Sequence, residues 1–385
     1  MIGFQLTEEQ EQMRQLAHRF AEEEIRPVAG DYDESDEMPW PVIEKAAQIG
    51  MTTFLYPENY GGGGVDSLLT TCIVAEELAW GCLGIGMSIL TLGLAAIPIL
   101  LAGNEQQKSQ YIPWFCDPDQ LKAGAFALTE PEAGSDVASI RTTAKRDRDN
   151  YILNGQKRFI TLGGIADLYV VFATLDPDAG HEAICAFIVE ANTPGLSAGK
   201  KEKKMGMRAS HTGDVILEGV RVPAENRIGE EGEGFYVAMR AFEHTRPLVA
   251  VAAVGLARAA YEYALEYAQQ RVQFGKPIIA KQAVRFMLAD MATEIDAARL
   301  LVWRAAWMAD QGLPCNLPAS MAKVYAADMA MKVTTNAVQI LGGYGYMREY
   351  PVEKWMRDAK ILQIVEGTSQ IQKVIISQLL AMGMA

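Results

Sequence analysis

LYVVFATL (168–175) and AICAFIVEA (183–191) are short runs rich in β-branched and aromatic residues, bounded by Asp, Gly or Asn. Runs of this length and composition are typical of β-strands. A third run, DVILEGVRVP (214–223), alternates apolar and polar residues and stops at a proline. Asn154-Gly155, between YIL and KRFIT, is the dipeptide most typical of a tight hairpin turn. Together these signals predict a β module over about residues 122–222.

Both flanks of this module have helical periodicity. EEQEQMRQLAHRFAEEEI (8–25) places apolar residues on one helical face, and a shorter helix is expected between Met38 and the loop YPENYGGGG (56–64). After the module, helices are predicted for VGLARAAYEYALEYAQQRVQF (254–274), QAVRFMLADMATEIDAARLLVWRAAWMADQG (282–312) and PASMAKVYAADMAMKVTTNAVQILGG (318–343). A last helix is expected to begin with a capping box from Ser369 to Gln372.

The order helices, strands, helices excludes a doubly wound sheet, which needs strands and helices to alternate. The fold class is therefore mainly α with an inserted β domain, a barrel or sandwich. The expected domains are an N-terminal helical domain (1–121), a middle β domain (122–230) and a C-terminal helical bundle (231–385).

Composition excludes several functions. The net charge of −13 argues against nucleic-acid binding, which needs a basic surface. Five dispersed cysteines and four dispersed histidines suggest no disulfide framework and no metal site, and favour a reducing, cytoplasmic or matrix-like compartment. The acidic N-terminus does not resemble a signal peptide. Leu78–Asn104 lacks charge, but its glycines, Pro98 and acidic flanks favour buried helices over a membrane span.

Three segments carry candidate chemistry, each with a structural alternative. LTEPEAGSD (128–136) offers hydroxyl and NH groups to a ring edge or phosphate, or forms an ordinary Asx- or ST-type turn. In KRFITLGG (157–164), Phe159 and Thr161 would face the same way on a strand and suit a flat heteroaromatic ligand, or Phe159 simply packs in the core. Glu366, in an apolar setting before a helix, is either a base or a helix-terminus charge.

Four motifs resemble the acyl-CoA dehydrogenase family over essentially the whole chain. They are LTEPEAGSD, RVQFGKPI (271–278), AVQILGGYGY (337–346) and PVEKWMRDAKILQIVEGTSQIQ (351–372), and they occur in the family's order. FEHTRPLVAVAAVGLARAAYEYA (242–264) is similar to the medium-chain type, and the chain resembles the medium-chain and short-chain members overall. The resemblance implies a C-terminal four-helix bundle, FAD held between that bundle and the β domain, and a homotetramer built as a dimer of dimers.

The resemblance also implies roles for individual residues. Contacts to the flavin in the same subunit are implied for Phe126, Leu128, Thr129, Ser135, Phe159 and Thr161. Contacts to the FAD of a neighbouring subunit are implied for Arg271, Gln273, Phe274, Gln339 and Gly343. Contacts to the adenosine and phosphate end of the cofactor are implied for Thr368 and Gln370. Substrate or CoA contacts are implied for Ser135, Glu243, Arg246, Val365 and Gly367. Phe159 stands where Trp is usual, and Gln273 where Thr is common.

Family members carry the catalytic base at one of two positions, here Glu366 and Thr245, so the resemblance implies Glu366 as the base. It would remove the α-proton of an acyl-CoA while hydride passes from the β-carbon to FAD, giving a trans-2-enoyl-CoA as in β-oxidation and fatty acid metabolism. An electron-transferring flavoprotein would accept the electrons. Val365 replaces a common Tyr, which either opens space for branched or cyclic acyl groups or is offset by bulk elsewhere. The alternatives are a decarboxylating or oxidase-type relative, or a non-dehydrogenating flavoprotein of the same fold.

Overall fold

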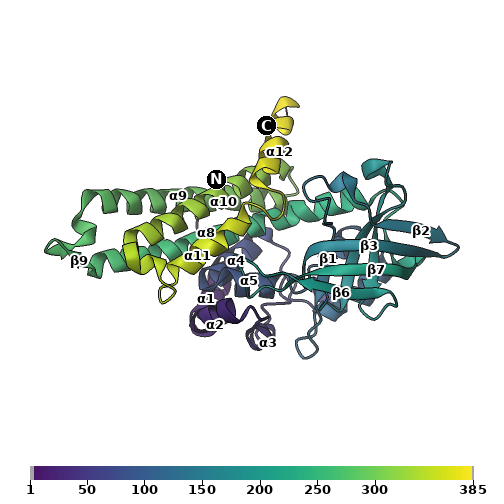
Figure 1. Ribbon diagram of the computed structural model, residues 1–385, viewed down its shortest axis with the longest axis horizontal. Helices are drawn as coiled ribbons and strands as arrows, with labels where there is room; N and C mark the ends of the chain where they lie inside the picture. Colours follow the sequence, from purple (N-terminus) through teal and green to yellow (C-terminus); the bar gives the residue numbers. More distant parts are fainter. Residues whose placement is uncertain (1–3, 384–385) are drawn as a thin grey trace.

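A computed structural model describes residues 4–383, with helices in the first and last parts of the chain and strands in the middle part. In space the sheet lies to one side of the helices (Figure 1). The N-terminal helices are α1 (Glu8–Phe20), α2 (Ala29–Ser35), α3 (Trp40–Gln48), α4 (Leu68–Gly81), α5 (Leu83–Leu90), α6 (Ala96–Ala102) and α7 (Glu105–Tyr111). The strands are β1 (Gly124–Ala127), β2 (Thr143–Asp147), β3 (Asn150–Thr161), β4 (Leu168–Thr174), β5 (Ile184–Glu190), β6 (Leu196–Lys201), β7 (Thr212–Pro223) and β8 (Arg227–Ile228). The C-terminal elements are α8 (Gly234–Gln270), a hairpin of β9 (Val272–Gln273) and β10 (Lys276–Pro277), α9 (Gln282–Asp310), α10 (Asn316–Leu341), α11 (Val352–Leu362) and α12 (Ser369–Ala381).

The uncharged stretch from Leu78 to Asn104 folds as parts of three separate helices, α4, α5 and α6. The chain leaves helical geometry at Cys82, which has extended dihedral angles, so no single helix in this stretch is long enough to cross a bilayer. In the described chain α8 alone is long and apolar enough to do so, and two-thirds of its most apolar window is buried. It packs against α4, α9 and α10, which explains its composition as that of a core helix.

The sheet has the order β6-β7-β3-β2-β4-β5-β8, with β1 lying parallel beside β4. It is not a closed barrel, since β6 and β8 do not pair with each other within residues 4–383. It does fold over itself as a sandwich does: β2 and β4 share one residue pair, and the ring centroids of Tyr151 on β3 and Phe187 on β5 lie 4.9 Å apart. Its edges need no closure, because β8 is only two residues long and β6 is exposed and ends in two lysines.

Both faces of β4 and β5 are buried. Val170 and Ile188 contribute to one apolar cluster together with the start of α8, while Val171 and Phe187 contribute to the main core on the other side. This burial explains why the two sequence runs are apolar throughout and do not alternate.

The hairpin predicted at Asn154-Gly155 is wrong. The turn between β2 and β3 lies earlier, after Asp147, which pairs with Asn150. β3 continues through Asn154-Gly155, where its pairing with β7 shifts register. A Cβ on Gly155 would stand 2.5 Å from the hydroxyl oxygen of Thr142, so this glycine allows β3 to approach the residue just before β2 closely.

The C-terminal helices form a bundle, and α8 extends from it to pack on β5 (Figure 1). Helix ends agree with the expected signals: α9 stops before Gly312 and α10 before Gly342. The expected capping box at Ser369 is wrong: Thr368 is the N-cap of α12 and its hydroxyl accepts a hydrogen bond from the amide of Ile371, whose apolar side chain cannot return the second bond of a box.

Candidate active site

Glu366 lies in a tight turn between α11 and α12. Its φ of 56° and the φ of 87° at Gly367 place two successive residues in left-handed geometry. A non-glycine residue adopts this geometry at a cost in free energy, and such outliers concentrate at functional sites. The buried Gln372 side chain donates to the Glu366 carbonyl over 3.0 Å, and the buried Lys323 ammonium donates to the Gly367 carbonyl over 2.7 Å.

The Glu366 carboxylate points toward α8, where the Thr245 hydroxyl donates to its Oε2 over 2.6 Å. Burial raises the pKa of Glu366, and the hydrogen bond from Thr245 and the charges of Arg246 and Lys323 only partly oppose this. The two positions at which the family carries its base are therefore in direct contact. Of these two groups the carboxylate is the one suited to accept a proton, because a hydroxyl is a poor proton acceptor at neutral pH.

The loop 128–136 is anchored by Glu130, whose side chain is buried. Its carboxylate accepts from the backbone amides of Arg141 and Thr142 at 2.6 and 2.9 Å, and from the Lys157 ammonium at 2.7 Å. Lys157, fully buried on β3, also donates to the Leu128 carbonyl. The loop is thus a rigid ledge held by an ion pair, and neither the Asx-turn nor the ST-turn interpretation describes it.

Thr129 and Ser135 are left available on this ledge. Thr129 is half-buried and Ser135 is exposed, and neither hydroxyl has a hydrogen-bond partner among residues 4–383. Phe126, at the end of β1, packs against Phe172 and Phe242 with ring centroids 4.7 and 5.5 Å away. Leu128 is buried beneath them.

Phe159 and Thr161 would face the same way only on a regular strand, and the strand is irregular at Phe159. β3 and β7 shift register between Lys157 and Ile160, and Phe159 has a φ of 57°. This bulge turns the aromatic ring outward, and 58% of Phe159 is exposed. The core-packing alternative for Phe159 is therefore wrong, while Thr161 remains half-buried on the strand.

The donor set and the exposed ring fit a flavin. An aromatic side chain held outward by a strained bulge supplies a face for a flat ring, and the free hydroxyls of Thr129 and Ser135 supply donors for its polar edge. FAD is the cofactor of the family that these motifs resemble, and these residues are of the kind that would hold it.

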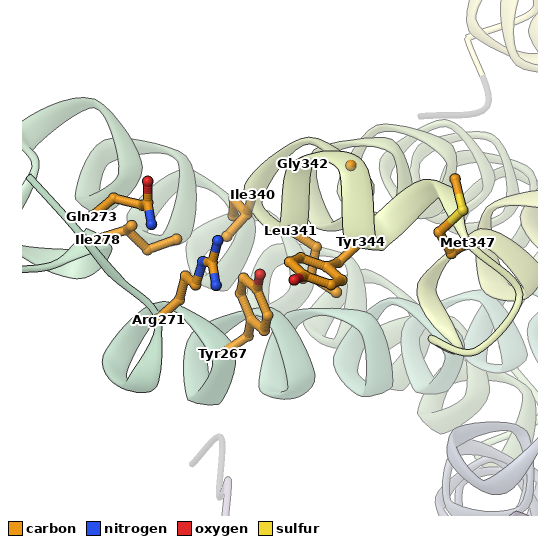
Figure 2. A pocket seen from close by; sticks show the side chains of 10 residues that line it. Tyr267, Arg271, Gln273, Ile278, Ile340, Leu341, Gly342, Tyr344 and Met347 are labelled. Atoms are coloured by element: carbon orange, nitrogen blue, oxygen red, sulfur yellow. The ribbon is translucent and has the colours of Figure 1, made fainter.

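A second group of implied cofactor contacts lies far from Glu366, at the other end of α8. Arg271 is the C-cap of α8 and follows Thr245 by 26 residues, which places it about 39 Å away along the helix. Here a pocket of about 500 Å3 is lined by Tyr267, Arg271, Gln273, Ile278, Ile340, Leu341, Gly342, Gly343, Tyr344 and Met347 (Figure 2). The Arg271 guanidinium lies 5.2 Å from the Tyr344 ring centroid.

The remaining residues with implied FAD contacts lie on three different elements. Phe274 has a φ of 54° and is 91% exposed on the β9–β10 hairpin, and Gln339 is exposed on α10 beside the pocket without lining it. Thr368 caps α12, and Gln370 is exposed in its first turn.

Of the implied substrate contacts, Arg246 and Gly367 lie beside Glu366. Arg246 is buried, donates to Asn316 over 3.2 Å, and keeps its Nε without a partner among the described residues. Val365 is 37% exposed next to Glu366, and Glu243 is half-buried one turn before Arg246. Ser135 belongs to the ledge described above.

Sequence reasoning missed the residues that hold the site in place: Glu130 with Lys157, and Lys323 with Gln372. One signal was available, since Lys157 and Lys323 both fall at apolar positions of their elements. Their partners are 27 and 44 residues away, and the sequence does not show them.

Comparison with known proteins covers all three parts of the chain. Acyl-CoA dehydrogenase N-terminal, middle and C-terminal domains match residues 7–119, 125–220 and 232–381. An acyl-CoA dehydrogenase of Bacillus subtilis is 48% identical over 380 residues, which is 98% of this chain and 99% of that protein.

Two solved structures have the same fold at full length. Butyryl-CoA dehydrogenase from Megasphaera elsdenii superposes with a TM-score of 0.95 at 44% identity, covering 99% of this chain and 100% of that one. A chain from a structure of the electron transferring flavoprotein of Acidaminococcus fermentans has a TM-score of 0.95 at 43% identity, covering 98% of this chain and 99% of that one. Matches in all three domains, with relatives this similar over nearly the full length, show that the chain belongs to the acyl-CoA dehydrogenase family.

Proposed function

We propose that this FAD-dependent acyl-CoA dehydrogenase acts on short-chain acyl-CoA thioesters and uses Glu366 as its base. The observation that carries the proposal is the Glu366 carboxylate, held at a strained turn and hydrogen-bonded to Thr245. The short-chain assignment is supported by the similarity to the butyryl-CoA dehydrogenase of Megasphaera elsdenii.

The environment of Glu366 suits proton abstraction near neutral pH. Burial raises its pKa, which makes the carboxylate a stronger base than one in water. The hydrogen bond from Thr245 favours the ionised form and opposes part of this rise in the pKa.

The backbone amide of Glu366 is a second functional group at the same turn, a hydrogen-bond donor. No residue among 4–383 accepts a hydrogen bond from it. An NH group fixed beside the base would polarise the thioester carbonyl and so acidify the α-carbon. FAD, when bound, supplies the acceptor for the hydride from the β-carbon.

The distance between Arg271 and Thr245 supports an oligomer. One flavin ring beside Glu366 cannot also contact Arg271 about 39 Å along α8. We assign the pocket at Arg271 and Gly343 to the FAD of a neighbouring subunit, within a homotetramer. An electron-transferring flavoprotein is proposed as the electron acceptor, supported by the match to a chain in the structure of the Acidaminococcus protein. A cytoplasmic location is part of the same proposal.

The test is flavin reduction in purified protein without oxygen, over straight, branched, cyclic and dicarboxylic acyl-CoAs, followed by turnover with a dye acceptor. Butyryl-CoA is expected to bleach the flavin fastest. Faster reduction by a branched or cyclic substrate would assign the space beside Val365 to that group. Carbon dioxide release or rapid oxidation by oxygen would instead favour the decarboxylating or oxidase alternatives.

Glu366→Gln tests the base. The amide keeps the volume and the backbone NH, so ligand should still perturb the flavin spectrum, while reduction should fall by about 10²–10⁴-fold or more. Glu349→Gln, at an exposed position just before the motif 351–372, is the matched control and should reduce at the parent rate. A Glu366→Gln variant that reduces as fast as the parent contradicts the assignment of the base.

A further inference from the structure

We propose that Lys323 is a positioning residue for this reaction: from α10 it holds the Glu366–Gly367 turn, and its positive charge sets the strength of Glu366 as a base. This inference rests on the proposed function, because it concerns the same carboxylate. It adds a residue that makes no contact with the reacting atoms and acts through the turn.

Lys323 differs from the other buried lysines of the described chain. Lys157 and Lys354 each lie within hydrogen-bond distance of a carboxylate, Glu130 at 2.7 Å and Asp358 at 2.6 Å. Lys323 is fully buried and has no carboxylate within 4 Å among residues 4–383. A buried cation without a paired anion costs free energy, so stability alone does not explain its position.

Among the residues that the structure describes, Lys323 makes one hydrogen bond, and it is directed at the Glu366–Gly367 turn. Its Nζ donates to the Gly367 carbonyl over 2.7 Å, and Gln372 donates to the same carbonyl over 3.3 Å. The left-handed geometry of Glu366 persists only if surrounding groups impose it. Lys323 and Gln372, from two different helices, are the groups that do so.

Lys323 also interacts electrostatically with Glu366. The charged groups facing Lys323 are Glu366 from the turn, Arg246 from α8 and Asp328 from its own helix. Burial lowers the pKa of Lys323 to about 8, with Arg246 acting in the same direction and the two carboxylates opposing it. Lys323 in turn lowers the pKa of Glu366 from the higher value that burial alone would give.

The sign of the pH dependence follows. Flavin reduction needs ionised Glu366, so the rate falls as the pH drops through the pKa of Glu366, which gives an acid limb. Loss of the Lys323 charge removes a group that favours the carboxylate, so this limb moves to higher pH. A second change in rate is expected near pH 8 in the parent, where Lys323 itself loses its proton.

The experiment measures the rate of anaerobic flavin reduction against pH for Lys323→Met and Lys323→Arg. In the Met variant the acid limb should move up by about 1 pH unit, the low end of the effect of a nearby opposite charge. Its plateau rate should fall about tenfold, since a charged hydrogen bond to the turn is lost. The Arg variant keeps the charge, so its acid limb should stay near that of the parent. Both variants should lack the change in rate near pH 8, because methionine has no titratable group and a guanidinium does not titrate there.

Lys332→Met is the matched control, since Lys332 is an exposed lysine on the same helix that pairs with Glu294. Thermal unfolding and FAD content identify any variant that is misfolded. Lys323→Gln, which keeps a donor for Gly367 without the charge, replaces the Met variant in that case and should show the same shift of the acid limb.

An acid limb in folded Lys323→Met or Lys323→Gln that coincides with the parent's overturns the inference. That outcome is distinct from failure of the proposed function, in which the parent reduces its flavin with no acyl-CoA or Glu366→Gln leaves the rate unchanged.

Discussion

The Thr245 hydroxyl donates a 2.6 Å hydrogen bond to Oε2 of Glu366 and joins two segments 121 residues apart in the sequence. The bond links α8, the helix that runs from the bundle to the sheet, to the turn before α12. Glu366 is thereby tied to α8, a buried helix of 37 residues, which is how a strained turn can present a carboxylate in one orientation.

Thr245→Val should weaken this control of Glu366. The hydrogen bond lowers a pKa that burial raises, so its loss raises the pKa of Glu366 further. A hydrogen bond to a charged group contributes about 1.5–3 kcal/mol, equivalent to about 1–2 pH units. The acid limb of flavin reduction should move up by that amount, with little change at high pH. Thr335→Val, at an exposed hydroxyl that bonds only to its own helix, is the control. An unshifted limb would show that the bond does not form in solution.

Arg271→Ala should loosen FAD and weaken the oligomer together. Arg271 lies at the pocket assigned to a neighbouring subunit's cofactor, so one substitution removes a contact that serves both. Flavin release followed by fluorescence and the mass measured by ultracentrifugation should change in parallel. Arg221→Ala removes an exposed arginine paired with Asp147 on the sheet and should change neither. If Arg271→Ala leaves both quantities at the parent value, the assignment of this pocket is wrong.

Lys157→Met should destabilise the ledge at 128–136. Burial alone would raise the pKa of Glu130, but Lys157 and the amides around the carboxylate hold it below its usual value. Removing the cation leaves a buried carboxylate without its partner, which costs about 3–5 kcal/mol of unfolding free energy. Lys145→Met, at an exposed position of β2, should cost little.

The cost of Lys157→Met should depend on pH. Because the folded pKa of Glu130 is lowered in the parent, the stability it contributes is present above its unfolded pKa and is lost as pH falls through the folded value. The difference between parent and variant, measured by urea unfolding, should therefore be largest at neutral pH and shrink in acid. An equal difference at every pH would argue that Lys157 contributes only packing.

Gly155→Ala should destabilise the sheet by about 1–3 kcal/mol, since the new methyl group meets both the side chain and Cα of Thr142. Gly30→Ala is a control that should raise the stability of the fold. Gly30 lies in α2 with open space around it, and alanine favours a helix by up to about 1 kcal/mol over glycine. Thermal unfolding of the two variants should shift in opposite directions.

The sequence by itself determined the order of helices and strands, the apolar runs of β4 and β5, and the glycine stops of α9 and α10. These features follow from signals within a few residues of the chain, such as β-branched composition, helical period and glycine stops. The sequence did not determine the ends of α8, which begins at Gly234 instead of Val254 and ends at Gln270, before the expected RVQF turn of helix. The motif resemblance named the family and the base, and the comparisons confirmed the family.

Tertiary structure decided how the site is held. Asn154-Gly155 has the composition of a turn, yet Thr142 lies so close that the glycine serves strand packing instead. The sequence places Phe159 two residues before Thr161, as on one face of a regular strand, yet a bulge against β7 turns Phe159 outward. Lys323 occupies an apolar position of a helix, yet it reaches a carbonyl 44 residues away. Each outcome depends on a contact between segments distant in the chain. Local propensity does not encode such contacts, because the energy that selects them comes from burial and hydrogen bonding in the assembled fold.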